Sequence, residues 1–156
     1  MTETESLQDR YSPNSICFGC GPKNPKGLLI KSRPEGDLLV ADWTPMPYHA
    51  AFSDFASGGI ISVLMDCHGN WTAAYALMKS RKLSRPPGTV TAEYTVRFLS
   101  PTPLDAQWHL RAWAAEIDGD RVRVEGYLEV RGEKTATMKG LFVAVKEDHP
   151  AFHRWQ

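Results

Sequence analysis

One acidic side chain, Asp66, interrupts a stretch from Gly58 to about Lys79 that is otherwise mostly apolar or small. On a helix, residues three, four or seven positions away share its face. Here they are small or polar, except Val63: Gly59, Ser62, Val63, Gly69, Asn70 and Ala73. Burying a carboxylate without partners costs free energy and raises its pKa toward the range useful for a general base. Asp66 is therefore either a catalytic group or part of a structural network, and the pattern alone leaves both open.

Three residues at the start of this stretch, Ser57, Gly58 and Gly59, could supply a second group for the chemistry. Serine is a favoured helix N-cap, and glycines let a ligand approach the backbone closely. The free N–H groups and the positive dipole end at a helix N-terminus suit a developing oxyanion. Taken alone, however, an ordinary helix cap is the simpler explanation of these residues.

Other candidates for chemistry carry weaker signals. His68 follows Asp66 by two residues, about 200° around a helix, so a structural histidine is favoured over an Asp–His pair. Cys17 and Cys20 form a C-x-x-C pair that Cys67 and His68 could in principle complete as a zinc site. Because the latter two lie in the predicted buried helix, we expect no metal and no cofactor.

The elements that must position these residues follow from the spacing of apolar side chains. The apolar stretch predicts one buried helix, Gly58 to about Lys79. Alternation with a period of two predicts strands. The predicted strands are 28–31, 38–43, 89–99, 107–116, 121–131 and 134–145. In 89–99 the alternation puts Val90 and Tyr94 on one face and Thr89 and Thr91 on the other. Short connections make the later strands antiparallel neighbours.

The fold class predicted from this order is α+β, with a long central helix wrapped by a curved antiparallel sheet of about five to six strands. The chain of 156 residues fits one domain, assigned to residues 16–156, after a flexible or loosely docked lead-in at 1–15. An irregular loop is expected from Thr44 to about Ser57.

Composition narrows the classes of partner and compartment. Eighteen basic and eighteen acidic residues give a formal net charge of zero, so nucleic acid is not an expected partner. The polar start resembles no signal peptide, and the apolar runs are too short to span a bilayer. Three cysteines do not make a secreted disulfide framework, so we expect a cytoplasmic protein without a membrane partner.

Four features together resemble the hotdog-fold thioesterases, specifically the PaaI-type branch. The segment CFGCGPKNPKGL at 17–28 is similar to the opening common in that branch. SGGIISVLMDCHGNWTAA, from Ser57, is similar to its His-Gly-Gly helix, with Ser57 at the His position and Asp66 at the acidic position. TVTAEYTVRFLSPTPL, from Thr89, is similar to the strand that follows, and the order of strands also agrees. The resemblance covers about residues 16–146.

The resemblance implies hydrolysis of an acyl- or aryl-CoA thioester. Asp66 would act as general base or nucleophile, the N–H of Gly58 would polarise the carbonyl, and Thr91 would help to hold the water. The further site residues that we assign are Ser57, as a catalytic residue, and Gly59, Ser62, Asn70 and Phe52, as substrate-binding residues. Sites in this family form between two subunits, which implies a homodimer, with a dimer of dimers as the alternative.

Two departures from the family pattern, Ser57 for the His and Ala51 where relatives place an Asn, keep other functions open. One is a non-catalytic acyl-CoA-binding module. Another is a hotdog enoyl-CoA hydratase or dehydratase, for which His49 is the only candidate histidine before the helix. The cluster Lys79, Arg81, Lys82 and Arg85 is favoured as a solvated helix end, with contact to coenzyme A phosphates as the alternative.

Overall fold

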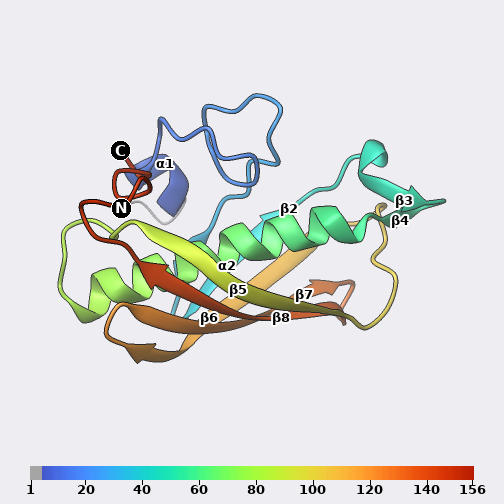
Figure 1. Cartoon of the computed structure of the whole chain (residues 1–156). Coiled ribbons are helices and arrows are strands. Elements are labelled where there is room, and N and C mark those ends of the chain that lie inside the picture. Colours follow the sequence, from blue (N-terminus) through green and yellow to red (C-terminus); the bar gives the residue numbers. More distant parts are fainter. Residues whose placement is uncertain (1–4) are drawn as a thin grey trace.

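A single long helix, α2 (Gly58–Ser80), packs against a six-stranded antiparallel sheet in the computed structural model, which describes residues 5–156 (Figure 1). The strand order is β1-β2-β6-β7-β8-β5. The strands are β1 (Arg33–Glu35), β2 (Leu38–Trp43), β5 (Thr89–Phe98), β6 (Trp108–Asp118), β7 (Arg121–Val130) and β8 (Glu133–Ala144). The predicted α+β architecture of one central helix and a single antiparallel sheet is confirmed.

The core lies between α2 and the sheet. The helix buries Ile61, Leu64, Trp71 and Leu77 almost completely, each contributing about 1.5–3 kcal/mol of burial free energy. Gly69 allows the closest approach, because a Cβ there would lie 2.7 Å from both Met138 and Phe142 of β8. The apolar character of α2 on nearly all sides therefore reflects a helix enclosed by the sheet and the terminal segments.

The hairpin at the start of the sheet differs from the prediction in one strand. Residues 28–31 were predicted to be a strand, but they are irregular and Leu29 has a positive φ of 56°. Their backbone bonds instead to the preceding loop, with Leu28 N donating to Phe18 O and Ile30 N to Gly19 O. The first strand is β1, which pairs with β2 across a turn at Gly36, where φ is 60°.

The strand β5 does not lie beside β6, so the predicted neighbour relation is wrong for this pair. It pairs with β8 and forms one edge of the sheet. The connection from β5 to β6 passes two strands, a span of about 14 Å at ordinary strand spacing, which its nine residues cover. The predicted relation holds for β6–β7 and β7–β8, whose connections are tight turns.

The expected loop from Thr44 to Ser57 contains short regular elements. They are a 3-10 turn, η1 (Pro47–His49), and a small hairpin of β3 (Ala50–Phe52) and β4 (Phe55–Ala56). The prolines that argued against a long element permit the 3-10 turn, with Pro47 at its first position.

The lead-in predicted over residues 1–15 contains a docked helix, α1 (Leu7–Tyr11); residues 1–4 lie outside the described part. Leu7 is 1% exposed, and the amide of Gln8 bonds to the backbone and side chain of Ser32. The single buried leucine and one glutamine gave no periodicity from which this docking could be predicted. Among residues 5–156, no helix has the length and apolar character needed to cross a bilayer.

Candidate active site

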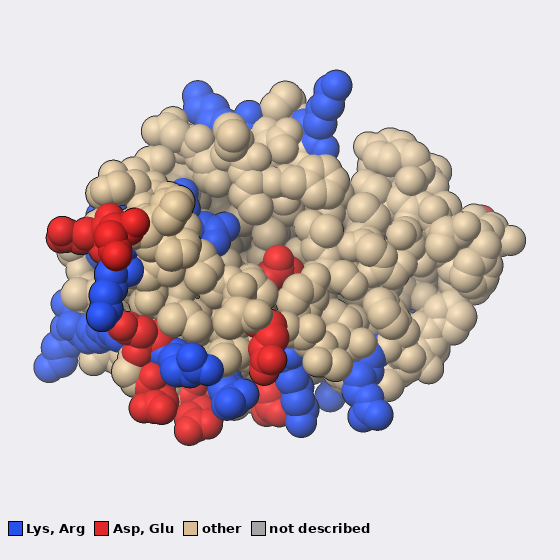
Figure 2. All heavy atoms as spheres, in the orientation of Figure 1, with Lys and Arg blue, Asp and Glu red and all other residues tan. Residues whose placement is uncertain are grey.

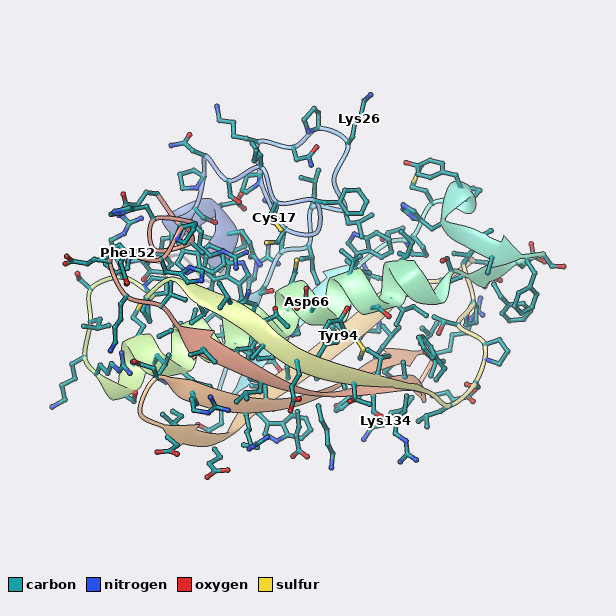
Figure 3. The ribbon with its side chains drawn as sticks, in the orientation of Figure 1. Cys17, Lys26, Asp66, Tyr94, Lys134 and Phe152 are labelled. Atoms are coloured by element: carbon teal, nitrogen blue, oxygen red, sulfur yellow. The ribbon has the colours of Figure 1, made fainter. Side chains whose placement is uncertain are left out.

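Asp66 lies on α2 facing β5. Its Oδ1 accepts a hydrogen bond of 2.6 Å from Thr91 Oγ1, and the carboxylate is half-buried. Figure 2 shows an acidic group at the bottom of a hollow in a largely uncharged surface, at the place where Figure 3 labels Asp66. The two residues that the sequence assigned to one catalytic centre, Asp66 and Thr91, are therefore in direct contact.

The electrostatic surroundings raise the pKa of Asp66 above its usual range. Burial is the main cause, opposed by the hydrogen bond from Thr91 and the positive charge of Arg154, while a charge on Cys17 raises the pKa further. A carboxylate with a raised pKa that still reaches solvent is suited to accept a proton near neutral pH.

Two neighbours of Asp66 were missed from the sequence, Tyr94 and Arg154. A register shift between Thr91 and Glu93 makes a bulge in β5. On the N-terminal side of the bulge, Thr91 contacts the helix. On its C-terminal side, Phe98 contacts the helix, with its ring 3.2 Å from the position that a Cβ on Gly58 would take. The strict alternation predicted for 89–99 is therefore wrong, and Tyr94 joins the Asp66 side, where burial and the Asp66 charge raise its pKa. Arg154 comes from the C-terminal tail, which carried no pattern.

The N-terminus of α2 has the expected cap. The Ser57 hydroxyl accepts from Gly59 N at 3.3 Å, and the Ser57 N–H donates to His49 O at 2.8 Å. The Ser62 hydroxyl donates to Gly58 O at 2.8 Å and is thus engaged with the helix backbone. Among the described residues, no side chain accepts a hydrogen bond from the N–H of Gly58, so this N–H can donate to a ligand.

Gly58 and Asp66 do not meet within one chain. Both lie on α2, and eight residues of helical rise separate them by about 12 Å. A single carbonyl group cannot contact both a carboxylate and an N–H at that separation. If both act on one substrate, they come from two copies of the chain.

The remaining predicted substrate residues lie apart from one another. Asn70 is 5% exposed, and its side-chain oxygen accepts from the Thr89 hydroxyl. Phe52 is 59% exposed on the β3–β4 hairpin, where it lines a hollow of about 340 Å³ with Ile61 and Phe98 near the helix N-terminus. Asn70 thus ties the helix to β5, while Phe52 lies on the Gly58 side of the molecule.

The three cysteines come together, although two were expected in a loop and one in the buried helix. The Sγ atoms of Cys17, Cys20 and Cys67 all lie within 4.8 Å of one another. His68 is directed elsewhere: its Nδ1 is 2.9 Å from Ser32 Oγ and its Nε2 2.9 Å from Leu39 O. Burial lowers the His68 pKa to about 4, as befits a neutral structural histidine.

Two members of the basic cluster after α2 make structural contacts. Arg81 bonds to Gly119 O and pairs with Asp120 at 2.8 Å, which joins the helix end to the β6–β7 turn. Arg85 donates to the backbone oxygens of Tyr11 and Trp155. These contacts agree with the structural interpretation of the cluster.

Comparison with solved structures decides the family. A thioesterase superfamily protein from Shewanella loihica PV-4 is 30% identical, with a TM-score of 0.65 over 75% of this chain and 91% of that one. This chain belongs to the thioesterase superfamily. The same fold occurs in the E. coli PaaI protein from the phenylacetic acid degradation operon, at 16% identity, a TM-score of 0.63, and coverage of 76% and 81%.

A more distant neighbour of this thioesterase-superfamily chain is an HP0420 homologue from Helicobacter felis. It is 12% identical, with a TM-score of 0.58 over 83% of this chain and 98% of that one. No family model matches the chain, and no curated protein does. The resemblance to hotdog thioesterases inferred from the sequence is thus confirmed by structural similarity.

Proposed function

We propose that this protein hydrolyses the thioester bond of an acyl- or aryl-CoA, with Asp66 as the catalytic carboxylate. The observation that carries the proposal is the half-buried Asp66, bonded to Thr91 and raised in pKa, at the bottom of a hollow in a thioesterase-superfamily fold. A carboxylate in this setting suits proton abstraction or nucleophilic attack.

The active unit that we propose is a homodimer formed through β5. This ten-residue strand is an edge of the sheet. It exposes Tyr94 and Phe98 by 37% and 55%, and Leu99, directly after it, is 56% exposed. A long edge strand that exposes aromatic side chains favours pairing with another strand. A symmetric dimer uses the same surface twice, so β5 would pair antiparallel with β5 of a second copy.

Such pairing explains the separation of Gly58 from Asp66. Along β5, Thr91 lies beside Asp66 and Phe98 beside Gly58. Antiparallel self-pairing centred between Thr91 and Phe98 would set each Thr91 opposite the other copy's Phe98. Asp66 of one copy would then approach Gly58 of the other, which gives two equivalent sites per dimer.

The reaction follows from these groups. As general base, Asp66 takes a proton from water while the water oxygen attacks the thioester carbon. The N–H of Gly58 from the second copy stabilises the oxyanion. The C–S bond then breaks, and the thiol of coenzyme A leaves with the proton. As nucleophile, Asp66 would instead form an acyl anhydride that water hydrolyses, so both routes need the same carboxylate.

A groove beside the first turn of α2 supports binding of an extended ligand. Its volume is about 300 Å³. Its lining residues are mainly apolar or aromatic: Phe18, Pro25, Lys26, Gly27, Leu28, Trp43, Thr44, Met46, Tyr48, His49 and Ile60. Apolar walls with few polar groups are typical of pockets for small molecules.

The histidine on which the hydratase alternative depends, His49, makes structural contacts. His49 Nδ1 accepts from Met46 N at 2.9 Å, which closes η1, and the His49 ring packs on Trp43. These contacts occupy Nδ1 and hold the ring within its own loop, which disfavours a role for His49 as the acid or base of a hydratase. A non-catalytic acyl-CoA-binding module remains the competing function, and it predicts binding without turnover.

The test is release of free thiol from short, long and aromatic acyl-CoAs, measured with wild type, Asp66→Asn and Asp37→Asn. We expect the Asp66 variant to lose at least about a hundredfold in kcat, the scale of a lost general base. Asp37→Asn, an exposed carboxylate in the β1–β2 turn, is the matched control and keeps full activity. If wild type and Asp37→Asn bind acyl-CoA but neither releases thiol, the protein is not a thioester hydrolase.

A further inference from the structure

The loop that precedes the sheet is fitted closely onto α2 at Cys67. A Cβ on Gly19, between Cys17 and Cys20, would lie 2.3 Å from Cys67 Sγ, so only glycine permits this approach. At Gly21 a Cβ would lie 2.3 Å from the backbone nitrogen of Cys17, so only glycine lets the loop fold back on itself there. Residues 17–21, Cys-Phe-Gly-Cys-Gly, thus form a tight turn that places two thiols beside the thiol of Cys67.

The spacing of the sulfur atoms matches a metal site better than a thiol cluster. Cys17 Sγ and Cys67 Sγ are 3.7 Å apart. Thiolates bound to tetrahedral Zn²⁺ at about 2.3 Å stand about 3.8 Å from one another. A disulfide, with sulfurs about 2.05 Å apart, would use only two of the three groups.

A hydrogen-bond donor also points at one of these sulfur atoms. The indole N–H of Trp71 donates to Cys20 Sγ at 3.4 Å. An N–H donor outside the ligand set supports a sulfur ligand and its orientation toward a bound metal.

We propose that Cys17, Cys20 and Cys67 bind one Zn²⁺ ion, which fastens the 17–28 loop to the central helix. Cys20 and Cys67 are buried, and Cys17 is half-exposed, which would leave the fourth ligand position on the Cys17 side open to water. Soft thiolate ligands select zinc over magnesium or calcium. The loop supplies Phe18, Lys26 and Leu28 to the groove beside α2, so the ion supports one wall of that groove (Figure 3).

The first test is the zinc content of protein made in zinc-containing medium and purified without chelator, measured by inductively coupled plasma mass spectrometry. We expect one zinc per chain in wild type and its loss in Cys17→Ser and in Cys67→Ser. The matched control is Asp66→Asn, next to Cys67 in the chain, which keeps the zinc while losing hydrolysis. This control separates the metal proposal from the proposed reaction.

A second measurement covers the case in which the serine variants do not fold. Wild-type protein stripped with a chelator under reducing conditions is titrated with Co²⁺. Thiolate-to-cobalt charge-transfer absorption that saturates at one ion per chain, and that added Zn²⁺ abolishes, supports the site. Purified wild type without zinc and without such absorption, or with a disulfide between two of the three cysteines, overturns it.

Discussion

At the scale of single residues, the properties of Asp66 come from its partners. Burial raises its pKa, while the Thr91 hydroxyl and the charge of Arg154 oppose that shift. A carboxylate base works only when ionised, so activity should rise with pH through this raised pKa. The pH dependence of kcat therefore reports on the contacts of one side chain.

Replacing Thr91 with valine tests this dependence. The variant loses the 2.6 Å hydrogen bond that favours the ionised form, so the pKa of Asp66 rises further. We expect the acidic limb of the pH profile to move to higher pH. Thr137→Val is the control, a half-buried threonine on β8 beside Trp113 and Lys139, and its profile should match wild type. A Thr91→Val profile identical to that of wild type would show that the hydroxyl does not act on the carboxylate.

Local rules of helix spacing and capping pointed to Asp66 and to the Ser57 cap, whereas Thr91 was assigned from the resemblance to a family. The sequence could not predict Tyr94 as a neighbour, because the bulge near Ala92 reverses the faces of β5 and no residue type marks it. The meeting of Cys67 with Cys17 was equally hidden, since it depends on how a glycine-rich loop folds back over fifty residues.

At the scale of elements, the site depends on how closely α2 approaches the sheet. The predicted helix and five of the six main strands agree with the structure to within about two residues, because their apolar periods are long. The prediction of a strand at 28–31 was wrong, because three apolar residues and a lysine whose backbone bonds to a neighbouring loop have the same sequence pattern as a short strand. The edge position of β5 could not be predicted either, because it depends on the three-dimensional course of the connection from β5 to β6.

Gly69→Ala tests this close approach. The added methyl group meets the rings and side chains of Phe142 and Met138 at 2.7 Å, so we expect a loss of about 1–3 kcal/mol in unfolding free energy. Gly59→Ala is the matched control on the same helix, since its nearest neighbour is Ser57 Oγ at 3.5 Å. Denaturant unfolding should leave that control at least as stable as wild type. Equal stability of the two variants would contradict close packing at Gly69.

At the scale of the whole molecule, function is proposed to require two copies of the chain. Gly58 and Asp66 are about 12 Å apart along one helix. The edge strand β5 contacts the helix near both residues and exposes Tyr94 and Phe98. Figure 2 shows few charged side chains on this face over the N-terminal half of α2 and the β3–β4 hairpin, as expected of a surface that another copy covers.

The two halves of the proposed site can be removed separately. Asp66→Asn removes the carboxylate, and Gly58→Pro removes the oxyanion N–H at the first helical position, where proline is tolerated. Gly58→Ala is the control for the proline, because its Cβ meets the same Phe98 ring at 3.2 Å while the N–H remains. Each inactivating change should lower kcat by about a hundredfold or more.

The most direct measurement is therefore the thioesterase activity of a hybrid dimer of Asp66→Asn and Gly58→Pro chains, purified by two different affinity tags. One of its two sites combines an intact Asp66 from one chain with an intact Gly58 from the other. We expect about half of wild-type turnover per dimer, far above either parent. A hybrid that forms but is as inactive as its parents would contradict a site shared between two subunits.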